Sequence, residues 1–211
     1  GAGLVTVGCP PAALIENAAR LDAIMLRPVG DAAALDDALA DPRITALCLG
    51  PGLGVGKATR DMVTSAFRPG ERGEGPSRPA GARLGVVLDA DALTSFGEAP
   101  EALFGLLDGG AVLTPHEGEF ARIFPDLAER LSGEATEVPA FSRIDAARAA
   151  GARAGCTVLL KGADTVIADA SGRAAISSAA YGRAAPWLAT AGAGDVLAGM
   201  IVGLLARRRA P

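Results

Sequence analysis

The sequence predicts a single three-layer α/β/α domain with a mostly parallel central sheet and an antiparallel hairpin near the C-terminus. Short apolar runs of strand length alternate with amphipathic stretches of helix length, which favours β-α units with helices on both faces of the sheet. Near the C-terminus, residues 165–177 instead form two strand-like runs around a Ser-Gly turn, which is typical of a hairpin. The 211 residues suffice for one medium domain with a hydrophobic core.

The elements follow from these patterns in chain order. We expect strands at residues 4–7, 23–26, 45–49, 84–88, 111–113 and 157–160. We expect helices at 12–20, 32–40, 57–67, 100–107, 117–124 and 143–154, and a last apolar helix after Gly194. Residues 68–83 are rich in Pro, Gly and Arg and predict a flexible surface insertion, and 132–140 predict a second loop. Because the opening residues already have a strand pattern, we expect the chain to start inside a domain.

Composition excludes several classes of protein. The net charge is −4, no basic stripe occurs, and one Trp and one Tyr offer little base stacking, so no nucleic-acid partner is expected. No apolar run has the length of a membrane span and no secretory signal is present, so no membrane partner is expected. The three cysteines lie far apart in apolar runs, which favours buried thiols in the reducing cytoplasm over a zinc site.

The polar and glycine-rich segments follow the predicted strands. They are GPGLG (50–54), DADALT (89–94), TPHEGEF (114–120) and KGADT (161–165), and TAGAGD (190–195) precedes the last helix. In open α/β sheets, ligands bind at the carboxyl ends of the strands. The sequence therefore predicts one ligand site at this edge of the sheet.

The segment before the last helix is the most informative. Gly192 and Gly194 fall at or before its first turn, where glycine lets backbone N–H groups approach an anion. Asp195 follows directly. Because a carboxylate repels a phosphate, its presence there indicates that Asp195 acts on the group that attacks or leaves. The alternative is a first-turn carboxylate that only stabilises the helix dipole.

Two other segments allow two interpretations each. The glycines of GPGLG favour either close approach of a phosphate or a tight turn that needs a positive φ, and Val55 and Gly56 break the P-loop pattern. Asp89 and Asp91 could hold Mg²⁺ through water or a ribose hydroxyl. Alternatively, Asp91 forms an Asx turn that caps the next helix.

The single histidine and one of the two lysines lie at strand ends. His116, with Glu117 and Glu119 after it, favours substrate contact, although a lone histidine is often structural. Lys161 ends an apolar strand, where an ammonium needs an anion or solvent. Phosphate contact is one role for Lys161, and an orientation into water is the alternative.

Together these segments resemble the NAD(P)H-hydrate dehydratases, a ribokinase-like family that repairs hydrated NADH and NADPH. The matching segments occur in the family's order and span nearly the whole chain: GAGLV (1–5), GPGLG, LDADAL (88–93), LTPHEGEF (113–120), LKGADT (160–165) and LATAGAGDVLAG (188–199). His116 is a specific feature, since ribokinase relatives usually carry Asn there. The resemblance implies a ribokinase-like domain over residues 1–211 that lacks the family's preceding strand-helix segment.

The resemblance also implies a chemistry and a set of residues. The hydroxyl at C6 of the hydrated nicotinamide is phosphorylated from ADP or ATP, and loss of phosphate restores the dihydropyridine. The hydrate would contact Gly52, Gly54, His116 and Asp195, and Asp195 would be the catalytic base. Glu119 would organise Mg²⁺ through water. The nucleotide would contact Lys161, Gly162, Ala163, Asp164, Thr165, Gly192, Ala193 and Gly194.

Two other functions fit parts of the pattern. One is a ribokinase-like kinase of a small alcohol such as a vitamin precursor, against which His116 argues. The other is a non-catalytic nucleotide-binding remnant. The resemblance further implies a homo-oligomer and an NAD(P)H-hydrate epimerase fused to this domain or paired with it.

Overall fold

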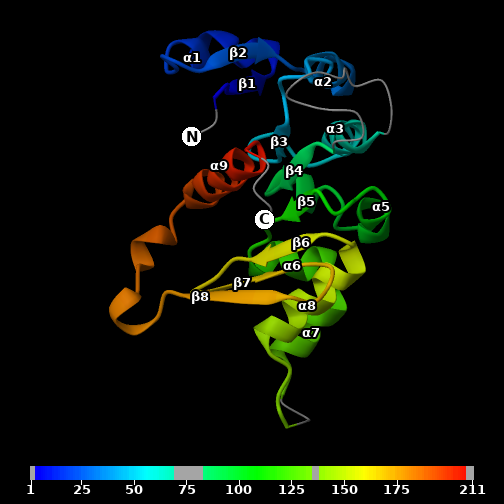
Figure 1. The fold of residues 1–211 in the computed structure, drawn as a ribbon, viewed down its shortest axis with the longest axis vertical. Coiled ribbons are helices and arrows are strands. Elements are labelled where there is room, and N and C mark those ends of the chain that lie inside the picture. Colours follow the sequence, from blue (N-terminus) through cyan, green and yellow to red (C-terminus); the bar gives the residue numbers. More distant parts are fainter. Residues whose placement is uncertain (1–2, 69–82, 135–137, 208–211) are drawn as a thin grey trace.

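A six-stranded sheet forms the centre of the molecule (Figure 1). The computed structural model describes residues 3–68, 83–134 and 138–207. Four parallel strands follow one another in chain order across the sheet, and an antiparallel hairpin continues it: β3 (Ala46–Leu49), β4 (Gly85–Leu88), β5 (Ala111–Leu113), β6 (Thr157–Leu160), β7 (Asp164–Ala168) and β8 (Ala174–Ser178). The predicted sheet and hairpin are therefore confirmed.

Helices cover both faces of this sheet, as predicted. Because each parallel strand lies beside its predecessor, right-handed connections place their helices on the same face. The main core lies there, around Phe120, Phe124 and Leu93. Its helices are α2 (Ala32–Leu39), α3 (Lys57–Phe67), α4 (Asp91–Thr94), α5 (Pro100–Phe104), α6 (Glu117–Ile123), α7 (Pro125–Ser132) and α8 (Arg143–Ala154).

The last helix, α9 (Ala193–Leu205), packs on β3 and β4 from the other face (Figure 1). Its contacts with the sheet come from Ala198, Ile201, Val202 and Leu205. Val196, Met200 and Leu204 form a second apolar stripe on this helix, but these residues are 59%, 64% and 52% exposed. Two apolar stripes run along this helix, so periodicity alone could not select the buried one.

The N-terminal strands form a separate two-stranded sheet. β1 (Thr6–Cys9) pairs in parallel with β2 (Met25–Pro28), and each begins two residues later than predicted. The expected helix 12–20 is a 3-10 turn (Pro11–Ala13) followed by the short α1 (Leu14–Ala18). Within the described residues this pair has no ladder to the six-stranded sheet, and Figure 1 places it beyond β3. A further strand-helix segment before it stays a prediction.

Local signals explain which boundaries were predicted well. α8 begins as expected because Ser142 and Asp145 form a capping box, and it ends at Gly155, whose φ is 65°. α7 was not predicted; Pro125 starts it directly after α6. The predicted insertion at 68–83 lies outside the described residues except at its ends. No described helix combines the length and hydropathy that a membrane crossing requires.

Candidate active site

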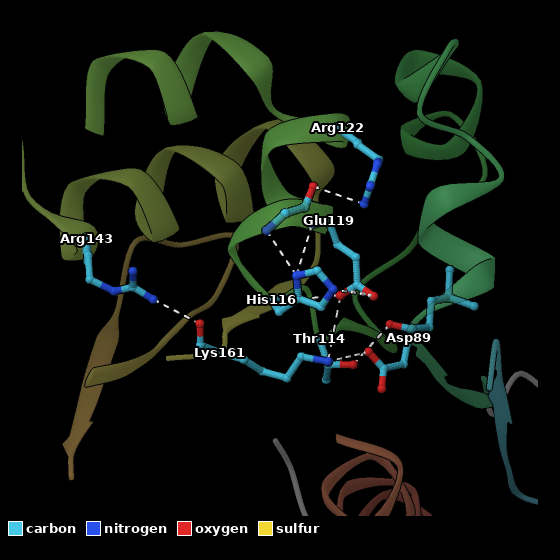
Figure 2. Close-up of polar contacts among 9 residues, drawn as sticks. Asp89, Thr114, His116, Glu119, Arg122, Arg143 and Lys161 are labelled. Carbon is cyan, nitrogen blue, oxygen red and sulfur yellow. Dashed lines mark hydrogen bonds and ion pairs between the residues drawn. The ribbon is translucent and has the colours of Figure 1, made fainter. Parts of the chain in front are cut away.

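The carboxyl ends of β4, β5 and β6 bring charged side chains to one edge of the sheet (Figure 2). The ammonium Nζ of Lys161 lies 2.7 Å from Asp89 Oδ1 and 3.7 Å from Glu119 Oε2. Asp89 and Glu119 are only 1% and 5% exposed. The anion that the Lys161 ammonium needs is thus supplied largely by the protein itself, a pairing that the sequence interpretation did not include.

His116 begins helix α6 as its N-cap. Its Nδ1 accepts hydrogen bonds from the backbone N–H groups of Gly118 (3.0 Å) and Glu119 (3.3 Å). Glu119 Oε2 in turn accepts from the His116 N–H at 2.8 Å, which completes a capping box. Because Nδ1 is an acceptor, the neutral ring carries its proton on Nε2, 3.3 Å from Glu119 Oε1. The side chain stays 55% exposed, so the histidine is both a structural cap and accessible to a ligand.

The N-terminus of α9 lies against the same ion pair. Gly192 precedes the helix with a φ of 89°, a left-handed conformation that favours glycine. A Cβ atom at Gly194 would lie 3.3 Å from Lys161 Nζ and 3.7 Å from Asp89 Oδ2. The first turn of α9 therefore adjoins the Asp89–Lys161 pair, as the predicted convergence requires.

Asp195 is exposed on this first turn. Burial first, and then the charges of Asp89 and Asp195, raise the pKa of the Cys48 thiol on β3 to about 11. The charges of Asp89 and Asp195 thus both raise the pKa of one thiol near the carboxyl end of β3. The Asp195 side chain is exposed and makes no hydrogen bond or ion pair with the other described residues.

The turn between β6 and β7, together with the start of β7, contains five of the predicted nucleotide residues, 161–165. The Lys161 N–H donates to Pro115 O at 2.8 Å, which ties the turn to the His116 loop. Thr165 Oγ1 donates to Gly162 O at 3.0 Å. Among the described residues, Asp164 Oδ1 is buried without a hydrogen-bond partner, which is uncommon for a buried carboxylate oxygen.

The GPGLG loop packs against the turn that follows β4. Gly52 and Gly54 adopt positive φ values of 70° and 79°. The Gly54 N–H donates to Asp91 Oδ2 at 2.8 Å, so Asp91 holds this loop. Space is open around Gly52, where no atom lies within 4 Å of a Cβ position.

Gly50 and Gly52 provide a matched pair for testing this loop. A Cβ atom at Gly50 would lie 1.7 Å from the Asp89 backbone oxygen, and the φ of Gly50 is 134°. We expect Gly50→Ala to lower the free energy of unfolding by about 2–3 kcal/mol through this clash and strain. Gly52→Ala has only the φ strain and should lower it by about 1 kcal/mol. Urea denaturation of both variants checks the difference, and equal losses would contradict the close approach at Gly50.

The sequence profile of the NAD(P)H-hydrate dehydratases matches residues 1–211. This chain belongs to that family. It is 35% identical over 217 aligned residues to the bifunctional NAD(P)H-hydrate repair enzyme Nnr of Gloeobacter violaceus, covering 100% of this chain and 36% of that protein. It is 38% identical over 164 residues to Nnr of Mycobacterium tuberculosis (strain H37Rv), covering 78% and 28%. The chain thus spans about a third of the length of these curated relatives.

Solved structures share the fold of this dehydratase-family chain. The ADP/ATP-dependent NAD(P)H-hydrate dehydratase of Bacillus subtilis, co-crystallised with ATP/Mg²⁺ and soaked with CoA, superposes with a TM-score of 0.62 at 23% identity, covering 97% of this chain and 64% of that one. A ribokinase-like superfamily protein of Enterococcus faecalis gives a TM-score of 0.66 at 22% identity, covering 97% and 62%. The ribokinase-like fold is therefore confirmed.

Two features of this candidate site were not predicted from the sequence. Asp89 and Lys161 follow β4 and β6, and only the placement of β5 between them shows that the two charges meet. Arg143 at the start of α8 donates to the backbone carbonyls of Lys161 and Asp164 in the segment after β6, and a helix-initiating arginine carries no sequence signal for this. Opposite charges at the carboxyl ends of two strands of one parallel sheet could have suggested the first feature.

Proposed function

We propose that this chain is the dehydratase unit of a metabolite-repair enzyme that restores hydrated NADH and NADPH with ADP or ATP. The proposal rests on one observation: the N-terminus of α9 lies against the Asp89–Lys161 ion pair, whose carboxylate is buried. An exposed carboxylate, Asp195, stands there beside backbone N–H groups. This arrangement suits removal of a hydroxyl proton next to a stabilised anion.

On the substrate side, four residues surround the proposed position of the hydrate. Gly52 offers open space, Gly54 lies beside it, and His116 presents a half-exposed ring after β5 at the same edge of the sheet. Asp195 accepts the proton of the C6 hydroxyl. The first turn of α9 supplies a helix N-terminus, which stabilises negative charge on the transferring group.

On the nucleotide side, two segments fit a phosphate-bearing ligand. Gly192, Ala193 and Gly194 form the N-terminal turn of α9, a geometry that binds anions. Residues 161–165 span the turn after β6 and the start of β7, where Asp164 Oδ1, buried and without a hydrogen-bond partner among the described residues, suits a hydroxyl or amino donor of a nucleoside. When bound, ADP or ATP supplies the phosphoryl group that carries away the hydroxyl oxygen as phosphate.

Mg²⁺ fits this proposal as a companion of the nucleotide. Among residues 3–68, 83–134 and 138–207, no three His, Cys, Asp or Glu side chains group to hold a metal. Mg²⁺ is commonly held by substrate phosphates, waters and one or two carboxylates, which such a surface still permits. Glu119 accepts from His116 and lies near Lys161, so we propose that it acts on Mg²⁺ only through water.

The test is a direct assay of dehydration. Hydrated NADH is incubated with the protein, ADP and Mg²⁺, and the absorbance of the dihydropyridine is followed. We expect nucleotide-dependent recovery of that absorbance. Phosphorylation of a hydroxymethylpyrimidine or thiazole alcohol with a silent hydrate assay would instead favour the small-alcohol kinase. Nucleotide binding without either turnover would favour the non-catalytic remnant.

The wider setting of the domain is also a proposal. The relatives are named bifunctional repair enzymes, and this chain spans 28–36% of their length. We therefore propose that an NAD(P)H-hydrate epimerase acts in the same or a partner polypeptide. A homo-oligomer and a cytoplasmic location complete the proposal, and size-exclusion chromatography with light scattering tests the former.

A further inference from the structure

We propose that Arg143 is the positioning residue of the nucleotide turn, residues 161–164. Its guanidinium ties the carbonyl groups of the turn to α8 and leaves the N–H groups of Gly162 and Ala163 for a nucleotide phosphate. This inference rests on the proposed function, because it concerns the turn at which the nucleotide is proposed to bind.

The guanidinium of Arg143 spans the turn from one end to the other. Nη2 donates to the Lys161 carbonyl at 3.0 Å, as Figure 2 shows, and Nε donates to the Asp164 carbonyl at 3.2 Å. Nη1 contacts the carboxylate of Glu117, the residue after His116. The side chain of Arg143 is 23% exposed. One planar group therefore fixes both ends of the turn and joins it to the start of α6.

The remaining carbonyl groups of the turn are also occupied. Gly162 O accepts from Thr165 Oγ1, and Ala163 O accepts from the Ala179 N–H at 2.8 Å. By contrast, the N–H groups of Gly162 and Ala163 donate to no atom in the described part of the chain, and both residues are exposed. A turn with engaged carbonyls and free N–H groups binds anions.

Gly162 shows how closely the guanidinium approaches the turn. A Cβ atom at Gly162 would lie 2.6 Å from Arg143 Nη2. A side chain at position 162 would therefore push the guanidinium away from the Lys161 carbonyl. Because the obstructing atom is the end of a flexible side chain, such a variant should still fold.

The test compares two arginines of the same helix. Arg148 donates through Nε to Gly172 O at 2.9 Å, in the turn between β7 and β8 at the other end of the hairpin. We expect Arg143→Met to raise the Kd for ADP roughly 10-fold, the effect of losing charge-assisted hydrogen bonds. Arg148→Met should change it less than about 2-fold, the scale of a surface substitution. Calorimetric titration with ADP measures both, and thermal melting checks the fold.

Three further measurements separate a positioning role from a structural one. Arg143→Met should raise the KM for ADP while kcat at saturating ADP is kept. Arg143→Lys retains the charge without the fork and should give an intermediate Kd. Gly162→Ala should weaken ADP binding in the wild-type background and add nothing in the Arg143→Met background, where the obstructing guanidinium is gone.

The outcomes distinguish this inference from the proposed function. If the wild-type protein does not bind ADP, the proposed function fails and this inference fails with it. If the wild type binds ADP and the Arg143 and Arg148 variants bind equally well, only the role of Arg143 is overturned. An effect of Gly162→Ala that persists in the Arg143→Met background also overturns it.

Discussion

Asp195→Asn is expected to lower single-turnover dehydration by about 10²–10⁴-fold, the usual contribution of a positioned base. The fold should be kept, because α9 is held by Ala198, Ile201 and Val202, which do not change. Asn also suits the first turn of a helix. ADP should bind as well as before or slightly better, since a negative charge beside the α9 N-terminus is removed.

The measurements are single-turnover dehydration of hydrated NADH, titration with ADP and thermal melting. The matched control is Asp164→Asn, which neutralises a carboxylate on the nucleotide side and should act mainly on ADP affinity. Near-normal turnover of Asp195→Asn would contradict its assignment as the base. Early melting together with loss of ADP binding would show that Asp195 serves the helix alone.

Lys161→Met is expected to lower the free energy of unfolding by about 3–5 kcal/mol, because it leaves the buried Asp89 carboxylate without its cation. The double variant Asp89→Leu/Lys161→Met removes both charges and should recover most of this loss. ADP affinity should not recover in the double variant, since the ammonium beside the nucleotide turn is still missing. The comparison therefore separates the effect of Lys161 on the free energy of unfolding from its effect on ADP affinity.

Urea denaturation and ADP titration of the single and double variants measure these effects. Lys57→Met is the control, because Lys57 forms only an exposed ion pair with Asp61 one turn along α3. It should change stability by less than about 0.5 kcal/mol. A double variant no more stable than Lys161→Met would show that the buried pair is not the source of the loss.

Much of the fold could be predicted because its signals are local. β5, β6, α3 and α8 have the predicted boundaries, since apolar runs, capping residues and glycine turns mark their ends. The strands β1 and β2 lie two residues later than predicted, because β1 continues through Gly8 and β2 through Arg27, beyond the apolar runs on which the predictions rested. α7 was missed because Pro125 starts a new helix directly after α6.

The site was predicted as a location but not as a set of contacts. Strand ends place Asp89, His116 and Lys161 at one edge, which topology alone dictates. The partners of these side chains depend on tertiary distances. The Lys161 ammonium meets Asp89, and His116 Nδ1 caps α6, and neither contact has a fixed spacing in sequence.

The position of α9 has a consequence for how the chain folds. Thr45 Oγ1 donates to Ala206 O across a separation of 161 residues, and α9 packs on β3 and β4, which are also distant from it in sequence. Such distant contacts form slowly, because the intervening chain must first be ordered. The β-α units from β3 to β6 are local and can assemble earlier. Until α9 docks, the face of the sheet around Val87 and Val112 remains uncovered and prone to aggregation, and the helix that carries Asp195 is absent from the site.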